Sequence, residues 1–216
     1  MLEQCNEYNI SEDGLLLPNP KLIEFHLNHT NVSKGSCNPR LIVTHYTAGP
    51  SLKSAVRSLT DPRRKASAHF IIDQYGKIAQ LVSTTQESWH AGKSAWDDDD
   101  GVPYTHINNI SIGIEFVNAG RLLKSTFPGG VLYRTWWGEE IHTDRVYDDG
   151  KFGWEVYSPE QLESGLALTA AILERHPGIT NIVGHSDICA PPGRKIDPGP
   201  AFPMEKFSNL IEDRSV

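Results

Sequence analysis

Short apolar runs rich in β-branched residues recur along the chain and predict the strands of one sheet. The run RLIVTHY, at 40–46, predicts a buried strand that ends at His45. The stretch SAHFIIDQYGKIAQLV, at 67–82, has two β-prone halves around a Gly-containing turn and predicts a hairpin. The run NIVGH, at 181–185, predicts a short strand that leads His185 into a loop. Two histidines therefore stand where predicted strands end.

Another strand is predicted at 111–118, where SIGIEFVN alternates between two faces. One face carries Ile112, Ile114 and Phe116, and the other carries Gly113, Glu115 and Val117. Glu115 is the unusual member, because burying a carboxylate is costly unless it is paired or coordinated. A structural ion pair and a catalytic general base are both compatible with this position.

Apolar residues spaced three to four apart predict helices at 51–62, 158–178 and 203–214. The helix at 158–178 has the clearest boundaries, with Ser158 as N-cap, Pro159 at the first helical position and a Pro-Gly pair after its end. Strands and helices that alternate over 216 residues predict a single α/β domain with a central sheet flanked by helices.

Three segments lack a clear periodicity of hydrophobic and polar residues. Residues 1–40 are polar and interrupted by prolines, which predicts an irregular N-terminal arm. Residues 119–157 are aromatic, polar and rich in glycine, and they are too long for a passive connection. We therefore predict an inserted loop or an extra hairpin there. The acidic stretch WDDDDG, at 96–101, predicts a solvated turn rather than a calcium site.

Composition and charge narrow the class of protein. A hydrophobic content of 38% and a charged content of 22% are typical of a folded, water-soluble domain. The net charge of −7 argues against a general nucleic-acid binder and against adhesion to anionic membranes, because both need a basic surface. Since no apolar run reaches the roughly 18 residues of a membrane span, we expect no membrane insertion.

The cysteines and the N-terminus bear on location. Cys5, Cys37 and Cys189 are odd in number and widely spaced, so they predict reduced thiols rather than a disulfide framework. The N-terminal residues have neither a basic start nor an apolar stretch, and they do not resemble a secretory signal. We expect a cytoplasmic monomer. The alternative is delivery outside the cell by phage lysis or by a secretion machine.

The two strand-end histidines are candidate metal ligands. Ligands tend to bind where the strands of an α/β sheet end, and neutral imidazole is a common ligand of zinc. A catalytic zinc site needs about three protein ligands and one open position. Asp187, Cys189 and Asp197 all follow His185 closely enough to supply the third, and spacing alone leaves this choice open.

Six ordered motifs give the chain a family resemblance. They are LIVTHYTAG, ASAHFIIDQYGKIAQLV, WHAGKSAW, NNISIGIEFVN, NIVGHSDI and GRKIDPGPAF. In this order they resemble the type-2 N-acetylmuramoyl-L-alanine amidases, which include the phage T7 lysozyme type and the peptidoglycan recognition proteins. The resemblance covers residues 40–118 and 158–207, and it implies a central mixed β-sheet flanked by helices.

The resemblance also implies a metal site and a reaction. Carried over by position, it makes His45, His185 and Asp197 the ligands of one Zn²⁺ per chain. It makes Glu115 the general base and Lys195 the helper that stabilises negative charge on the carbonyl oxygen. The reaction it implies is hydrolysis of the amide between N-acetylmuramic acid, or its 1,6-anhydro form, and the L-alanine of the peptidoglycan stem peptide. Peptidoglycan fragments are therefore the expected partners.

The resemblance further places Trp89 and His90, in WHAG, on the substrate side of the fold, and we expect both residues to contact substrate. His69 is expected to be a structural residue. In the inserted segment, Trp136 and Trp137 are candidates for sugar or peptide contact, with covering of the core as the alternative.

Two departures from the family pattern stand out. The loop between His185 and Lys195 is longer than in cytosolic recycling members by residues of the stretch CAPP, which keeps Cys189 as a minor ligand candidate. Asp73 and Gln74 stand where those members carry basic residues.

Three other functions compete with a zinc amidase. A recognition protein of the same fold would grip peptidoglycan without cutting it, but no metal ligand of the family pattern is lost here. No feature of the sequence favours a main role in binding another protein. An unrelated zinc peptidase is weaker, because the chain lacks HExxH.

Overall fold

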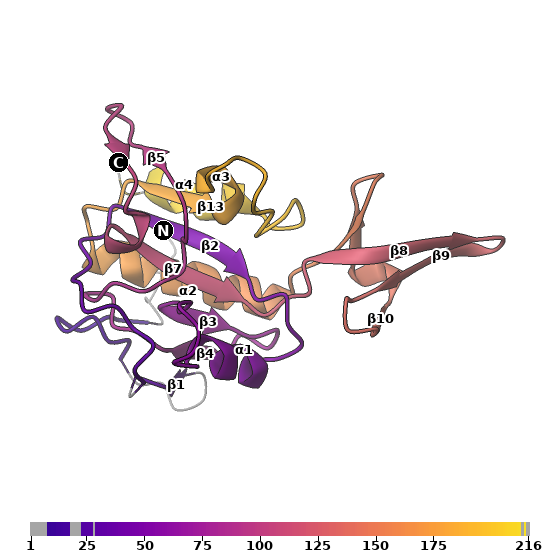
Figure 1. Ribbon diagram of the computed structural model, residues 1–216, viewed down its shortest axis with the longest axis horizontal. Coiled ribbons are helices and arrows are strands. Elements are labelled where there is room, and N and C mark those ends of the chain that lie inside the picture. The colour runs from indigo at the N-terminus through magenta and orange to yellow at the C-terminus, as the bar shows by residue number, and fades with distance from the viewer. Residues whose placement is uncertain (1–7, 18–22, 28, 213, 215–216) are drawn as a thin grey trace, which may run out of the picture.

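The computed structural model describes residues 8–17, 23–27, 29–212 and 214. Cys5 and the rest of 1–7 lie outside the described residues. At the centre is a six-stranded mixed sheet, with the strands in the order β1-β4-β3-β7-β2-β13 (Figure 1). Its strands are β1 (Ile23–Phe25), β2 (Leu41–Tyr46), β3 (Phe70–Ile72), β4 (Ile78–Gln80), β7 (Ser111–Phe116) and β13 (Asn181–Gly184).

Parallel pairing holds the middle of this sheet together. β2 pairs with β7 on one side and with β13 on the other, and β7 also pairs with β3 in parallel. The register places His45 directly opposite Glu115 and Gly184 opposite Thr44. Because parallel strands end at the same edge of a sheet, the C-terminal ends of β2, β7 and β13 lie together.

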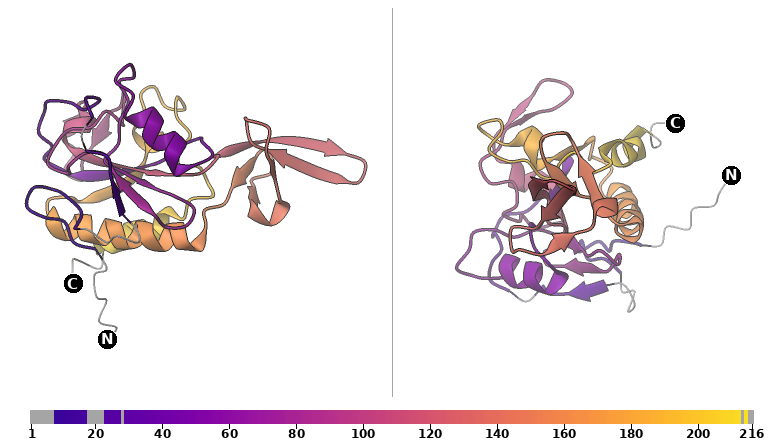
Figure 2. Two further views of the ribbon diagram at one scale, coloured as in Figure 1. Left: turned by 90° about the horizontal axis from the view of Figure 1, so that it is seen from below. Right: turned by 90° about the vertical axis from the view of Figure 1, so that its right-hand side faces the viewer.

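One face of the sheet is covered by α2 (Pro159–Arg175) and α4 (Met204–Glu212) (Figure 2). The buried residues of this layer include Ile112, Ile114 and Phe116, as the alternation of 111–118 predicts. Ser158 caps α2 by accepting a hydrogen bond from the Gln161 amide. This long amphipathic helix packs its apolar side against β7 and the neighbouring strands, so solvent is excluded from this face of the sheet.

Helix α1 (Leu52–Leu59) and a looped segment cover the opposite face of the sheet. α1 packs on Ile71, Leu81 and Val117, and Ser51 provides its capping box. The looped segment contains β5 (Trp96–Asp97), β6 (Pro103–Tyr104) and the short 3-10 helix η1 (Ile107–Asn109). This second face is the one from which His45 and Glu115 project.

Each helix and strand predicted from residue patterns is present. The strand at 40–46, the hairpin at 67–82, the strand at 111–118 and the strand at 181–185 are confirmed as β2, β3–β4, β7 and β13. The three predicted helices are confirmed as α1, α2 and α4. His185 begins a further short helix, α3 (His185–Ile188).

Residues 119–157 form a second sheet rather than a loop or a single hairpin. Its order is β10-β9-β8-β12-β11, all antiparallel, and its long hairpin β8–β9 projects away from the six-stranded sheet (Figure 1). The strands are β8 (Arg121–Phe127), β9 (Gly130–Arg134), β10 (Glu140–Ile141), β11 (Val146–Asp148) and β12 (Gly153–Glu155), with the 3-10 helix η2 (Thr143–Arg145) between β10 and β11. We call this unit the projecting sheet.

The projecting sheet is anchored at its base by one buried carboxylate. Glu155 accepts hydrogen bonds from the Ala119 amide at 2.6 Å, from Arg145 at 2.5 Å and from the Gln74 side chain at 3.2 Å. Gln74, one of the two residues that replace basic residues of the cytosolic recycling members, therefore contacts the projecting sheet.

The N-terminal segment adds a strand to the edge of the central sheet. β1 pairs in parallel with β4, where an irregular arm was predicted. The Gln80 side chain also accepts from the Leu16 amide and donates to the Gly14 carbonyl, which ties residues 14–16 to the sheet. None of the described helices is long and apolar enough to cross a membrane.

Candidate metal centre and active site

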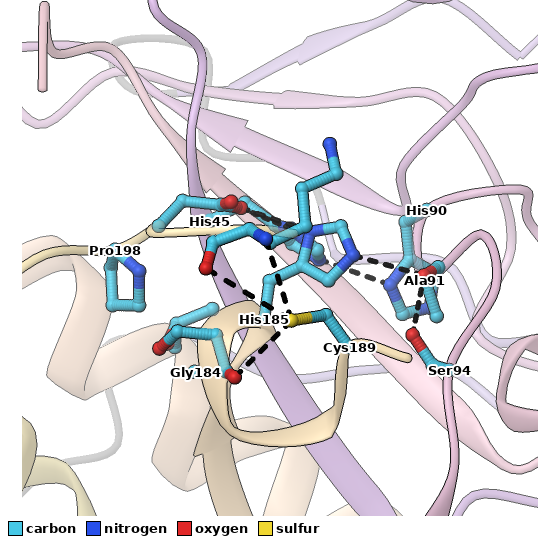
Figure 3. A network of polar contacts seen from close by, with 12 residues as sticks. His45, His90, Ala91, Ser94, Gly184, His185, Cys189 and Pro198 are labelled. Atoms are coloured by element: carbon cyan, nitrogen blue, oxygen red, sulfur yellow. Dashed lines mark hydrogen bonds and ion pairs between the residues drawn. The ribbon is translucent and has the colours of Figure 1, made fainter. Parts of the chain in front are cut away.

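Three side chains converge at the C-terminal ends of β2 and β13. Two of them, His45 and His185, are labelled in Figure 3. The Nδ1 atoms of His45 and His185 are 3.1 Å apart. Oδ2 of Asp197 lies 2.9 Å from His45 Nδ1 and 3.0 Å from His185 Nδ1. Three acceptor atoms that face a common point form a site for a cation, and all three residues are buried. The structure therefore brings together the three ligands that the family resemblance implies.

The backbone explains why these residues meet. His45 ends β2, and His185 follows Gly184 at the end of the neighbouring parallel strand. The Ser186 amide donates to the Asp197 carbonyl at 2.9 Å, which fastens the returning loop beside α3. Asp187 instead accepts from the Gly184 amide at 2.7 Å, so its carboxylate supports the turn and does not join the cluster.

The outer nitrogens of both histidines are also engaged. His185 Nε2 lies 2.9 Å from the Ala91 carbonyl, and His45 Nε2 lies 3.1 Å from His90 Nδ1. A carbonyl can only accept, so His185 carries its proton on Nε2 and leaves Nδ1 with a lone pair. This is the tautomer that a metal ligand needs.

Charge at the cluster favours a bound cation. Burial alone would raise the pKa of Asp197, but the adjacent rings of His185 and His45 hold it below its ordinary value, so the carboxylate is ionised. Burial lowers the pKa of His45 despite the opposing effect of Asp197, so its imidazole is neutral. One carboxylate oxygen and two imidazole nitrogens form a donor set that suits a divalent cation such as zinc.

Glu115 faces the cluster from the adjacent strand. Its Oε2 atom is buried and has no hydrogen-bond partner among the described residues. Burial, followed by the negative charge of Asp197, raises the pKa of Glu115 to about 8, although the ammonium of Lys195 acts in the opposite direction. Among the described residues Glu115 forms no ion pair, which was one of the two roles that the sequence allowed. The carboxyl group instead has one oxygen without a partner among the described residues, and its pKa lies close to neutral pH.

Lys195 is partly buried and lies on the loop that carries Asp197. Its charge acts on both His45 and Glu115, which places the ammonium near the cluster. The same side chain lines a cavity of about 540 Å³, together with Asp187 and Ile196. Lys195 therefore stands between the candidate metal centre and open space.

The stretch CAPP is explained by packing rather than by ligation. Sγ of Cys189 accepts from the Lys195 amide at 3.4 Å and lies 3.4 Å from the Ser186 carbonyl, inside the loop (Figure 3). The Ala190 amide donates to the Lys93 carbonyl at 3.0 Å, and the Arg194 guanidinium donates to the same oxygen at 2.6 Å. The longer loop thus braces residues 91–95, and Cys189 is outside the three-residue cluster.

The tryptophans predicted to contact substrate occupy different surroundings. Trp136 is 66% exposed, and its Nε1 donates to the Ala48 carbonyl at 2.8 Å, just beyond His45. Trp137 is partly buried and packs against the apolar cluster of the projecting sheet. Trp89 is partly buried, and its backbone pairs with Ser67. Of the three, Trp136 presents the most indole surface beside the site.

His90 is buried rather than open to a substrate. Its Nδ1 meets His45, and its Nε2 lies 3.0 Å from the Ser111 hydroxyl. Both ring nitrogens are therefore used inside the protein, which disagrees with the expectation that His90 contacts substrate. His69 is also buried, between the Gln86 carbonyl and the Gly113 amide.

Ser111 and Gly113 belong to the site and were not predicted from the sequence. A Cβ atom on Gly113 would lie 2.4 Å from Cγ of His90, so only glycine leaves room for that ring. The signal was present in SIGIEF, where Ser111, Gly113 and Glu115 alternate onto one face.

Comparisons with known proteins agree with this geometry. A family model described as N-acetylmuramoyl-L-alanine amidase matches residues 35–200. N-acetylmuramoyl-L-alanine amidase AmiD of Escherichia coli is 32% identical over 78% of this chain and 52% of its own length. 1,6-Anhydro-N-acetylmuramyl-L-alanine amidase AmpD of Citrobacter freundii is 26% identical over 82% of this chain and 83% of its own.

A solved structure extends the agreement to the fold. It is the complex of Escherichia coli AmiD with the substrate anhydro-N-acetylmuramic acid-L-Ala-D-gamma-Glu-L-Lys. That structure aligns with a TM-score of 0.58 and 27% identity over 93% of this chain and 65% of the AmiD chain. The chain thus spans about half of AmiD and most of AmpD. Because the family model covers most of its length, including all three converging residues, the chain belongs to the N-acetylmuramoyl-L-alanine amidase family.

Proposed function

We propose that this protein is a zinc hydrolase that cleaves the amide between N-acetylmuramic acid and the L-alanine of the stem peptide. The observation that carries the proposal is the convergence of His45, His185 and Asp197 in a chain of this family. Two relatives are named as amidases of this bond, one of them for the 1,6-anhydro form.

Zinc is the metal that the donor set favours. Two imidazole nitrogens and one carboxylate oxygen leave one or more positions free for reactants, as catalytic zinc sites do. When bound, zinc supplies a positive charge that polarises the scissile carbonyl and acidifies water. One ion per chain fits the single cluster found among the described residues.

Glu115 is the proposed general base. Its unpartnered Oε2 is free to take a proton from water, and its pKa, raised to about 8 by burial, is close to that required near neutral pH. The same carboxyl group then donates the proton to the departing amine of L-alanine. This exchange needs no nucleophilic cysteine, which agrees with the buried position of Cys189 inside its loop.

Lys195 is proposed to stabilise the carbonyl oxygen as negative charge develops on it. Its ammonium lies near the cluster and beside a cavity, so it can approach an oxygen that enters from solvent. The side chain is only partly buried, which leaves it free to adjust when substrate binds.

The substrate is proposed to be a muropeptide, with Trp136 as the first candidate for contact with sugar or peptide. Its exposed indole is held by the hydrogen bond to Ala48, three residues after the candidate ligand His45. Trp89 and Trp137 have less free surface and are weaker candidates. A cytoplasmic location and a monomeric state remain predictions.

One assay tests the proposal directly. Zinc-loaded protein is incubated with an anhydromuramyl tripeptide and, separately, with intact peptidoglycan, and free stem peptide is measured with and without a chelator. We expect release of peptide that stops on removal of zinc. Binding without release would favour a recognition protein of the same fold, and release that survives complete zinc removal would refute the metal mechanism.

A further inference from the structure

We infer that His90 is a positioning residue for the metal centre, seated on Ser111 and Gly113, and that the dipeptide His90-Ala91 fixes the orientation of both histidine ligands. The inference rests on the proposed metal site but not on the proposed hydrolysis. It replaces the expected contact of His90 with substrate.

The hydrogen bonds that connect His45 to His90, Ser111 and the Ile107 carbonyl allow only one assignment of donors and acceptors. If His45 Nδ1 binds a metal, its proton must be on Nε2, which then donates to His90 Nδ1 at 3.1 Å. His90 must in turn carry its proton on Nε2, which donates to the Ser111 hydroxyl at 3.0 Å. That hydroxyl donates to the Ile107 carbonyl at 2.6 Å. A backbone carbonyl that can only accept therefore ends the series and fixes every tautomer in it.

Strand β7 provides the seat for the ring of His90. Ser111 and Gly113 lie on the same face of the strand, one offering a hydroxyl and the other an absence of side chain. The ring occupies the space next to the Gly113 Cα, where a Cβ would lie 2.4 Å away. Ser111 and Gly113 both contact the imidazole of His90, and neither belongs to the cluster of three candidate metal ligands. A buried ring held by shape and by two hydrogen bonds has one orientation.

The next residue holds the other ligand. The Ala91 carbonyl accepts from His185 Nε2 at 2.9 Å. Its own position is fixed by a hydrogen bond of 2.8 Å from the Ala91 amide to the Asn108 side chain and one of 2.6 Å from the Ser94 hydroxyl to the Ala91 carbonyl. Adjacent residues on one segment thus receive the outer protons of both histidine ligands.

The test compares two substitutions of His90 by zinc affinity, measured in competition with a chromophoric chelator. His90→Phe keeps an aromatic ring but offers no acceptor to His45, so we expect zinc affinity to fall roughly 10- to 100-fold. His90→Asn places an amide oxygen near the position of Nδ1, so it should recover part of that loss. Ser111→Ala keeps His90 and removes only the acceptor behind it, and we expect a smaller loss in the same direction.

His69→Asn is the matched control. His69 is an equally buried histidine beside His90, with ring centroids 5.8 Å apart, but it does not contact a metal ligand. We expect this substitution to lower thermal stability without changing zinc affinity. If His90→Phe and Ser111→Ala fold and bind zinc within twofold of the parent, or if His69→Asn weakens zinc as much as His90→Phe does, the inference is wrong. Zinc affinity is measured without substrate, so an absence of amidase activity would leave this result interpretable.

Discussion

The six-stranded sheet and the projecting sheet are both built from short strands, but they expose their side chains very differently. Every residue of β7 except Glu115 is buried. Along β8 only Leu122 is buried and five of the seven residues are exposed, among them Leu123 at 61% and Phe127 at 51%. The central sheet has layers on both faces, and the projecting sheet has a small apolar cluster of its own.

This difference bears on what each sheet could contribute to the proposed function. A metal site and a base with a raised pKa require side chains that are shielded from solvent and held in one geometry. Of the two sheets, only the covered one provides such surroundings. An exposed sheet with aromatic side chains can instead meet a large ligand at little cost in stability. Trp136 makes one of the contacts between the two regions, through its hydrogen bond to Ala48.

The largest expected effect comes from removing a metal ligand. Asp197→Ala leaves two buried imidazoles without the carboxylate that they share, so zinc should be lost and peptide release should fall by at least about 1,000-fold. Zinc content by atomic absorption and release of stem peptide measure the two effects on one preparation. Full zinc content with normal activity would contradict the assignment of this ligand.

Glu115→Gln should separate binding of metal from chemistry. The amide cannot accept the proton, so the rate should fall by roughly 100- to 10,000-fold while zinc content stays at one per chain. In the parent protein, activity should decline as acid protonates Glu115, and this acidic limb should vanish from the residual activity of the variant. A variant that loses zinc together with rate would show that Glu115 holds the metal instead.

The metal-free protein should reveal the same carboxyl group through its stability. The folded pKa of about 8 lies above the ordinary value of 4.5, so the stabilising effect of the protonated form is complete below pH 4.5 and is lost as pH rises through 8. Glu115→Gln removes this loss. We expect its Tm to gain several degrees on the metal-free parent between pH 5 and pH 9, measured by thermal denaturation in the presence of a chelator. Parallel pH profiles of the two proteins would contradict the raised pKa.

The smallest effect is expected at the edge of the projecting sheet. Trp136→Ala removes an exposed indole, so we expect KM for a muropeptide to rise about three- to tenfold, with kcat, zinc content and Tm little changed. Trp137→Ala is the matched control, because its ring packs within the projecting sheet, and it should lower Tm more than it raises KM. Equal KM values for the parent and Trp136→Ala would remove this residue from substrate binding.

Sequence patterns predicted the central sheet well, because its strands and helices carry strong periodicity. The alternation in 111–118 and the capping signals at Ser158 are local features, and both survive in the fold. The projecting sheet was expected only as a loop or a hairpin, since its strands are short and half exposed and have no strict alternation. Its pairing depends on contacts such as that of Glu155 with Ala119, which no local pattern encodes.

The candidate site was predictable to a similar degree. The positions of His45 and His185 at strand ends follow from the sequence, but the third ligand was chosen only by family resemblance. Spacing could not show that Asp187 would turn back to cap Gly184 while Asp197 returned to the cluster. The burial of His90 was missed for the same reason, because it depends on a glycine from another strand.

The pairing of His45 with Glu115 across β2 and β7 links the site to the way the chain folds. Neighbouring strands lie about 4.8 Å apart, so this register determines how far the candidate ligand His45 is from the candidate base Glu115. A slip of one residue would set Ile114 or Phe116 opposite His45 and turn the carboxylate to the other face. The site cannot form on a misaligned sheet. If the protein binds zinc as proposed, the first tight zinc binding during refolding would therefore mark the moment at which these two strands are in register.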